Sequence, residues 1–366
     1  MGKVALFIPD YRGGGAEKVF VNVANELYLK GHDVDMLTIS NEGVFKGDVL
    51  LGIRKKSFNT RKLITAIPKL ILHLLKNEYD VIYTAMDHVN LVGFISIRFV
   101  RLFGINTRQV ASVHTNISNV LSNMSTFRSL VYSKVMSFLY ENIDNVFCVS
   151  SGCRNDLTKT LGLDIKSIDV IYNPVVKIED IDIIYATVAK KENHDVINIL
   201  SIGRLEEVKD YPTALKAVSK LVHEKGINIK YTILGEGSQR EFLELEVENL
   251  NIKDHVCFKG FVSNPLHYLV NSDLFVLCST YEGFGNVLVE ATEANVPIIS
   301  SRCMTGPIEI VNNENCFFET KNAESLYLKI LEFVNSDSKI GFINGKSNRF
   351  SFENIIREYE GYIIRE

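Results

Sequence analysis

The sequence predicts an α/β protein with two domains, each built on a parallel sheet with helices on both faces. Its length of 366 residues is more than one domain usually contains. Short apolar, β-rich segments alternate with helical patterns from the first residues, which is typical of a parallel sheet. This alternation stops near residue 175 and starts again with a strand at 197–202. We therefore expect domains at 1–175 and 195–350, joined by the charged, weakly patterned residues 176–194.

The elements of the first half are predicted from apolar runs bounded by glycine and polar residues. Strands are expected at residues 4–8, 34–39, 109–114 and 145–150, with a helix that ends near residue 30. The glycine loop Gly13-Gly14-Gly15 follows the first strand, where an open α/β sheet binds its ligands. A dinucleotide loop has the spacing G-x-G-x-x-G, and Lys18 occupies its last position. An NAD site is therefore not favoured.

In the second half, two cations follow a strand and precede a helix. Gly203, Arg204 and Lys209 come after the strand at 197–202, and Pro212 lies near the start of the next helix. Arginine offers a two-pronged contact to phosphate and lysine a point charge. Taken alone they are compatible with two surface cations, and together with the next motif they indicate a phosphate site. Two further strands are expected before glycine or polar turns, at residues 231–234 and 256–262.

The most informative stretch, residues 279–290, reads STYEGFGNVLVE and follows an apolar strand at 274–278. Gly283 and Gly285 leave the backbone open, and a helix begins near Asn286, so its positive end favours an anion. Glu282 and Glu290 bracket the loop with carboxylates that accept hydrogen bonds from hydroxyls. A ligand with hydroxyls on both sides of a diphosphate, a nucleotide sugar, fits this pattern. An isolated pair of glutamates at this spacing would more often be a turn residue and a solvated helix residue.

The strings EGFGNVLVE, GRLEEVKDY and GGAE together resemble the retaining glycosyltransferases of family 4 over the whole chain. The resemblance implies the GT-B fold, in which two Rossmann-like domains face a central cleft. It implies acceptor binding by the first domain, donor binding by the second, and a C-terminal helix at 351–366 that crosses back to the first. It also implies catalytic roles for Glu282, Arg204, Lys209 and His114, and donor contacts from Gly14, Gly15, Gly203, Gly235, Val262, Gly283, Phe284, Gly285, Asn286, Val287 and Glu290.

The implied reaction moves a hexose or N-acetylhexosamine from a UDP-sugar to a glycan acceptor, lipid-linked, in cell-surface polysaccharide or glycolipid synthesis. The loop SRCMTGPIEI at 301–310 resembles members that use UDP-sugars. Arg204, Lys209 and the helix start near Asn286 would neutralise the departing diphosphate, so we expect neither a metal ion nor a cofactor. Two alternatives stay open: a nucleotide-sugar epimerase of similar fold, and a non-catalytic nucleotide-sugar-binding protein.

Two D-x-D strings, Asp33–Asp35 and Asp180–Asp182, resemble the metal motif of a different glycosyltransferase fold. That fold does not repeat a second Rossmann-like half, as this chain does. We therefore interpret neither as a metal site.

Charge is unevenly distributed along the chain. Residues 1–175 hold 20 basic and 15 acidic residues, although the whole chain has a net charge of -4. Residues 54–76 and 91–108 mix basic with apolar side chains, which suits either a helix with a solvated basic edge or an anionic membrane surface. The net charge does not favour nucleic acid. Six scattered cysteines, no signal peptide and no membrane span predict a cytoplasmic protein. The basic and apolar segments and the uneven charge are the basis for the hypothesis that it is peripheral on the inner face of the membrane.

Overall fold

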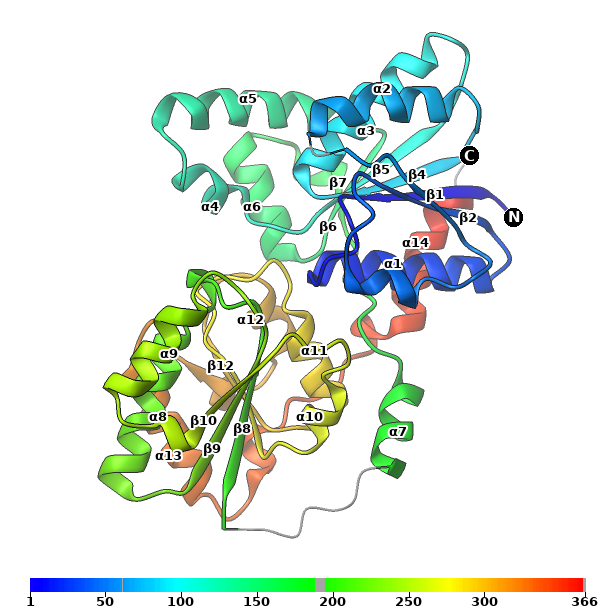
Figure 1. Cartoon of the computed structure of the whole chain (residues 1–366). Coiled ribbons are helices and arrows are strands. Elements are labelled where there is room, and N and C mark those ends of the chain that lie inside the picture. The colour runs from blue at the N-terminus through cyan, green and yellow to red at the C-terminus, as the bar shows by residue number, and fades with distance from the viewer. Residues whose placement is uncertain (61, 188–194, 365–366) are drawn as a thin grey trace. The chain divides into compact units, whose positions relative to one another are not determined.

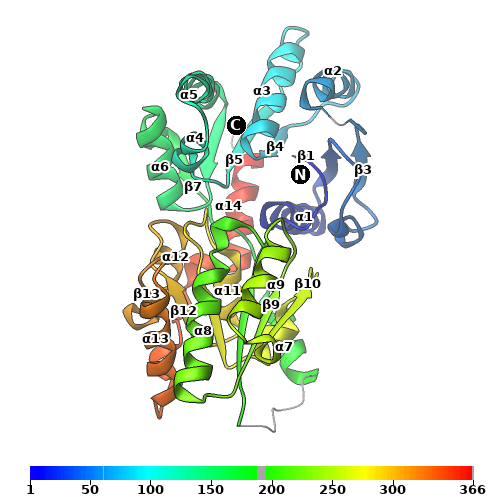
Figure 2. The ribbon, with the colours of Figure 1, turned by 60° about the vertical axis from the view of Figure 1, so that its left-hand side comes forward.

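The computed structural model describes residues 1–60, 62–187 and 195–364. The chain divides into two compact units (Figures 1 and 2). Unit 1 contains Met1–Val175 and Asn348–Glu366, and unit 2 contains Val176–Ser347. Each unit has its own parallel sheet and core.

Unit 1 is organised around a fully parallel seven-stranded sheet in the order β3-β2-β1-β4-β5-β6-β7. The strand order reverses between β1 and β4, which is where open sheets of this kind bind ligands. The strands are β1 (Lys3–Ile8), β2 (Asp33–Thr38), β3 (Arg54–Ser57), β4 (Val81–Ala85), β5 (Arg108–Val113), β6 (Asn145–Cys148) and β7 (Ile168–Val170).

Helices cover both faces of this sheet, and strand β1 shows why. Val4, Leu6 and Ile8 join the core under one face, whereas Ala5 and Phe7 join the core under the other. A strand buried on both faces reads as a continuous apolar run, as this one does. Helices α1 (Gly15–Leu29) and α14 (Phe352–Ile364) cover the first face. The second face is covered by α2 (Leu63–Leu74), α3 (Asp87–Arg101), α5 (Thr126–Asn142) and α6 (Ser151–Leu161), and the short α4 (Ile117–Ser122) joins the same core.

The C-terminal helix α14 belongs to the core of unit 1. Tyr359 is buried beside Tyr83 and Phe147, with ring centroids 5.7 and 5.3 Å away. The hydroxyl of Tyr362 donates to Asp169 at 2.5 Å. These buried aromatic side chains hold the end of the chain to the sheet of unit 1.

Unit 2 repeats the same strand order in a six-stranded parallel sheet, β10-β9-β8-β11-β12-β13. Its order reverses between β8 and β11. The strands are β8 (Ile197–Ile202), β9 (Ile229–Leu234), β10 (Val256–Gly260), β11 (Leu274–Leu277), β12 (Ile298–Ser301) and β13 (Phe317–Phe318). The helices are α7 (Ile178–Thr187), α8 (Tyr211–Lys225), α9 (Arg240–Asn249), α10 (Leu266–Val270), α11 (Asn286–Glu293), α12 (Gly306–Ile310) and α13 (Ala323–Asn335).

Part of the segment expected to be a linker is instead helical. Residues 178–187 form α7, in which Ile181 and Ile184 are buried and the hydroxyl of Tyr185 donates to the carbonyl of Ala294. The isoleucines lie three residues apart, a helical spacing that the many charges of the segment obscured. Residues 188–194 lie outside the described part of the chain.

Among the described residues, no helix combines the length and the apolar character that are needed to cross a bilayer.

Candidate functional site

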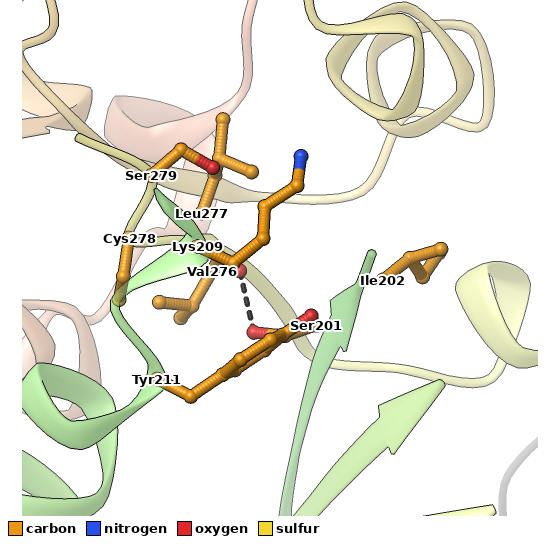
Figure 3. Close-up of a pocket in the computed structure, with 8 residues that line it drawn as sticks. All are labelled: Ser201, Ile202, Lys209, Tyr211, Val276, Leu277, Cys278 and Ser279. Atoms are coloured by element: carbon orange, nitrogen blue, oxygen red, sulfur yellow. Dashed lines mark hydrogen bonds between the residues drawn. The ribbon is translucent and has the colours of Figure 1, made fainter. Parts of the chain in front are cut away.

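The motifs in the second half of the chain that predicted a binding site lie together at one edge of the unit 2 sheet. The loop after β8 carries Gly203, Arg204 and Lys209, and the loop after the neighbouring strand β11 carries residues 278–285. Both loops lie at the carboxyl ends of their strands, where the strand order reverses. Lys209, Cys278 and Ser279 of these loops line a small pocket (Figure 3). The strands β8 and β11 and the start of α8 contribute its other lining residues, Ser201, Ile202, Val276, Leu277 and Tyr211.

A tightly bonded group of three side chains stands at this pocket. The ammonium of Lys209 donates to Oε1 of Glu282 at 2.5 Å, and the hydroxyl of Ser279 donates to the same oxygen at 2.6 Å. Side-chain exposure is only 15% for Lys209 and 13% for Glu282, so this ion pair is better shielded than a surface pair. One carboxylate oxygen is thus committed to two protein donors.

Backbone contacts fix the loop that carries Glu282. The hydroxyl of Thr305 donates to the carbonyl of Glu282, and the hydroxyl of Ser301 donates to the carbonyl of Ser279 at 2.6 Å. On the other side, the amide of Thr280 donates to the carbonyl of Val208 at 2.8 Å. The loops after β8, β11 and β12 are therefore bonded into one frame. Such bonding holds a charged group in a defined place before any ligand arrives.

Two glycines at this edge of the sheet are required because a Cβ would not fit. A Cβ on Gly306 would lie 1.7 Å from the carbonyl oxygen of Phe284. Gly235 has φ +143°, and a Cβ there would lie 1.9 Å from the carbonyl oxygen of Gly203. Neither atom is the end of a flexible side chain, so a side chain would displace backbone at the site.

Helix α11 begins at Asn286 directly after the glycine loop. Its N-cap is Gly285 with φ +102°, a left-handed conformation that suits glycine. Val287 lies in the first turn, and Glu290 lies one turn further on the same helix. Gly283 and the buried Phe284 complete the loop before it. An anion placed here would meet the positive end of the helix dipole.

Arg204 and Lys209 were both predicted to hold the donor diphosphate, but their surroundings differ. Arg204 is exposed, whereas Lys209 is partly buried against Glu282. The nearest acidic neighbour of Arg204 in sequence, Glu206, is occupied by Ser238, whose hydroxyl and amide hold the pKa of that carboxyl below its usual range. Arg204 therefore remains at the solvent side, and Lys209 lies on the protein side.

The remaining predicted donor contacts of unit 2 lie beyond two neighbouring strands. Gly235 follows β9, and its amide donates to the carbonyl of Gly260 at 2.8 Å. Val262 is partly buried two residues after the end of β10. Both lie at the carboxyl side of the sheet that also carries Lys209.

Gly14, Gly15 and His114 lie on unit 1. Gly14 is the N-cap of α1 and Gly15 its first residue, in the loop that follows β1. His114 follows β5 directly, at the carboxyl edge of the sheet. Burial lowers the pKa of His114 to about 4, so the ring is neutral near pH 7.

The tautomer of His114 follows from its partner. Ser112 donates its single hydroxyl proton to the carbonyl of Thr84 at 3.0 Å. Nε2 of His114, 2.9 Å from that hydroxyl oxygen, must then be the donor. Nδ1 is left as a hydrogen-bond acceptor, which suits contact with a hydroxyl.

The sequence did not single out Ser279 and Thr305, although both fix Glu282. Ser279 stood in the quoted stretch, and a hydroxyl three residues before a carboxylate was the available signal. The sequence also gave no role to Asp87, which accepts hydrogen bonds from Tyr132 at 2.8 Å and Tyr140 at 2.6 Å. Residues so distant in sequence are brought together only by the fold.

The aspartates of the first D-x-D string have partners within the protein, and those of the second string are exposed. Asp33 pairs with Arg54 at 2.8 Å, and Asp35 accepts from Tyr79 at 2.5 Å. Asp180 and Asp182 are exposed on α7.

Comparison with known proteins is consistent with this geometry. The structure of Anabaena Alr3699/HepE in complex with UDP-glucose superposes with a TM-score of 0.81 at 19% identity over 99% of each chain. The apo form of the lipopolysaccharide outer core galactosyltransferase WaaB gives 0.69 at 18% identity, again over 99% of each chain. The fold is therefore that of the GT-B glycosyltransferases, as the sequence predicted.

The family follows from two models that together span most of the chain. The model described as Glycosyltransferase Family 4 matches residues 13–176, and that described as Glycosyl transferases group 1 matches residues 186–350. The chain belongs to glycosyltransferase family 4 and is a glycosyltransferase. It is 28% identical over 335 residues to the N-acetylgalactosamine-N,N'-diacetylbacillosaminyl-diphospho-undecaprenol 4-alpha-N-acetylgalactosaminyltransferase of Campylobacter jejuni, covering 87% of this chain and 89% of that protein.

Proposed function

We propose that the protein transfers a hexose or N-acetylhexosamine from a UDP-sugar to a lipid-linked glycan in the synthesis of a surface polysaccharide or glycolipid, with retention of configuration. Relatives named for such reactions support this proposal. Two Campylobacter jejuni relatives, at 28% and 26% identity, are named for adding N-acetylgalactosamine to undecaprenol-linked acceptors. A Staphylococcus aureus relative, 30% identical over 151 residues, is named as a poly(ribitol-phosphate) N-acetylglucosaminyltransferase.

The observation that carries the proposal is the group formed by Lys209, Glu282 and Ser279 beside the start of α11. A diphosphate at this edge of the sheet would meet the ammonium of Lys209 and the positive end of the helix. Arg204, exposed on the same loop, would supply the second cation. The unbonded side of the Glu282 carboxylate would accept hydrogen bonds from sugar hydroxyls, and Glu290 from the ribose.

The proposed chemistry is a substitution at the anomeric carbon on the face that the diphosphate leaves. The bond from the anomeric carbon to the phosphate oxygen breaks, and a bond to the acceptor oxygen forms. The acceptor proton passes to the departing phosphate oxygen. Lys209, Arg204 and the amide end of α11 stabilise the negative charge that develops on the diphosphate. His114, with Nδ1 as an acceptor, would orient a sugar hydroxyl.

We also propose that the acceptor binds unit 1 and that the enzyme works in the cytoplasm on the anionic inner face of the membrane. The basic and apolar segments at 54–76 and 91–108 support this, although several of their cations have internal partners. Arg54 pairs with Asp33 and Asp35, and Arg101 pairs with Asp144. We therefore expect solvent-facing basic residues elsewhere on unit 1 to contribute to the attraction to anionic lipid.

The test is a transfer assay with a panel of UDP- and GDP-sugars, with and without undecaprenyl-diphosphate-linked glycan acceptors. We expect one UDP-sugar to give a new lipid-linked product whose anomeric configuration matches the donor. Conversion between free UDP-sugars without acceptor would instead indicate an epimerase. Nucleotide-sugar binding without turnover on any acceptor would indicate a binding protein.

A further inference from the structure

Helix α5 presents apolar side chains on both its inner and its outer side. Its inner side is buried through Met136, Leu139 and Tyr140. A helix that lies on a soluble domain normally has a polar outer face. The outer side of α5 carries five exposed large apolar residues: Phe127 (77% exposed), Leu130 (56%), Val131 (47%), Val135 (42%) and Phe138 (60%).

The apolar surface continues from α5 onto α3. Phe94 of α3 packs edge-on against Phe138 at 6.2 Å, and Arg98 donates to the carbonyl of Asn142 at 2.8 Å. Beyond this contact, α3 exposes Ile95 and Phe99, and Leu102, the C-cap of the helix, is exposed on the same face. We call the exposed apolar residues of α3 and α5 the apolar surface. It is wider than the single exposed side chains that are normal on proteins.

This surface is held rigidly. Tyr132 and Tyr140 on the inner side of α5 both donate to Asp87 at the start of α3. The hydroxyl of Ser137 donates to the carbonyl of Leu161 at the end of α6 at 3.0 Å. The outer side chains of α5 are therefore presented by a helix that the fold fixes in place.

The charge around the apolar surface is mainly positive. Residues 87–142, which span α3 and α5, contain five basic residues and two acidic ones, Asp87 and Glu141. Residues 49–77 contain seven basic residues and no acidic residue. Arg128 and Lys134 are exposed on α5 among the apolar side chains. Apolar side chains beside an excess of cations are complementary to a membrane with anionic headgroups.

We propose that the outer sides of α5 and α3 form a membrane-docking surface, with Phe127, Leu130 and Phe138 in the interface and Arg128 and Lys134 at the headgroups. This rests on the proposed function only in naming the membrane as the place of the acceptor. The α5 helix was absent from the sequence-based membrane prediction, which pointed to 54–76 and 91–108.

The test is flotation of the full-length protein with phosphatidylcholine vesicles, with and without phosphatidylglycerol. We expect binding to the anionic vesicles that weakens as salt increases. The double variant Phe127→Glu/Leu130→Glu should lower the bound fraction about tenfold or more, because two exposed apolar anchors are lost. The matched control is Phe242→Glu/Leu245→Glu on α9, where the side chains are 46% and 59% exposed, and it should float like the wild type.

Equal flotation of both double variants would overturn the proposal, as would no flotation of the wild type at low salt. A wild-type dimer that the α5 variant dissociates, with flotation unchanged, would mean that a second copy covers this surface. UDP binding should be equal in all three proteins, which shows that they are folded. Flotation that depends on α5 in a protein that transfers no sugar would contradict the proposed function and leave the docking surface standing.

Discussion

The two units share one strand order but carry different chemistry where that order reverses. In unit 2 this edge holds an ion pair, Lys209 with Glu282, that hydroxyl groups fix in place. In unit 1 the strands β4 and β5 are followed by a network centred on Asp87, with Tyr132 and Tyr140, and by the neutral ring of His114. A fixed ion pair suits a diphosphate, whereas the neutral ring of His114 suits a hydroxyl group.

The largest effect is expected when the ammonium group of Lys209 in unit 2 is removed. Lys209→Ala should lower kcat/KM on the order of 10²-fold or more, because a charge that stabilises the departing diphosphate is lost. It also leaves the partly buried Glu282 without its ion-pair partner, so we expect a larger loss than for Arg204→Ala. Steady-state kinetics with the donor that the transfer assay identifies would measure both losses.

Lys216→Ala is the control, because Lys216 is exposed on α8 and does not line the pocket. Its kinetics should match the wild type. Near-normal turnover by Lys209→Ala would remove the role proposed for the ion pair.

A variant of Ser279 should have a smaller effect, and it tests whether this residue positions Glu282 or supports nucleotide binding. Ser279→Ala removes a hydrogen bond to a charged oxygen, a contact worth ~1.5 kcal/mol or more, so kcat/KM should fall about tenfold. UDP affinity should stay unchanged, because Ser279 is assigned only to the sugar-side carboxylate. Ser300→Ala, another buried serine, bonded to the carbonyl of Ser301, serves as the control. If UDP affinity dropped as much as turnover, Ser279 would be a general support of the loop.

The smallest effect concerns the neutral ring of unit 1. Unfolding raises the pKa of His114 from about 4 towards its usual ~6.5, so the unfolded chain binds the extra proton first. His114 therefore makes the free energy of unfolding fall as the pH drops from about 6.5 to about 4, and adds no pH dependence above that window. Denaturant unfolding at pH 7 and pH 5 should show a smaller decrease for His114→Asn than for the wild type. An equal decrease in both proteins would mean that His114 is not buried in its neutral form.

Much of unit 2 was predictable because its signals are local. The strand before residue 278, the glycine loop and the helix that begins at Asn286 follow one another in sequence, and each has its own propensity signal. The partnership of Lys209 with Glu282 was not predictable in this way, since 73 residues separate them and only the parallel pairing of β8 with β11 brings their loops together. The sequence predicted that both residues contact the ligand, but it did not predict that they form an ion pair.

Unit 1 was harder to interpret for a related reason. Its α5 helix has apolar residues on all sides, so no periodic pattern shows which side faces the core. The prediction for α7, which belongs to unit 2, failed in the opposite way. Its acidic residues resembled a linker, although Ile181 and Ile184 are buried. For both helices, the part of the fold against which the helix packs decides which side is buried. The sequence of the helix alone does not reveal that part.

The close approach of Gly306 to the carbonyl of Phe284 limits how this enzyme can be re-engineered. Anyone seeking a different sugar preference has little freedom in the main chain there, since any bulkier residue at that point would force two loops apart. Substitutions must therefore be made at neighbouring positions that tolerate them. The first position to randomise is Met304, because its side chain on the adjoining loop is 78% exposed.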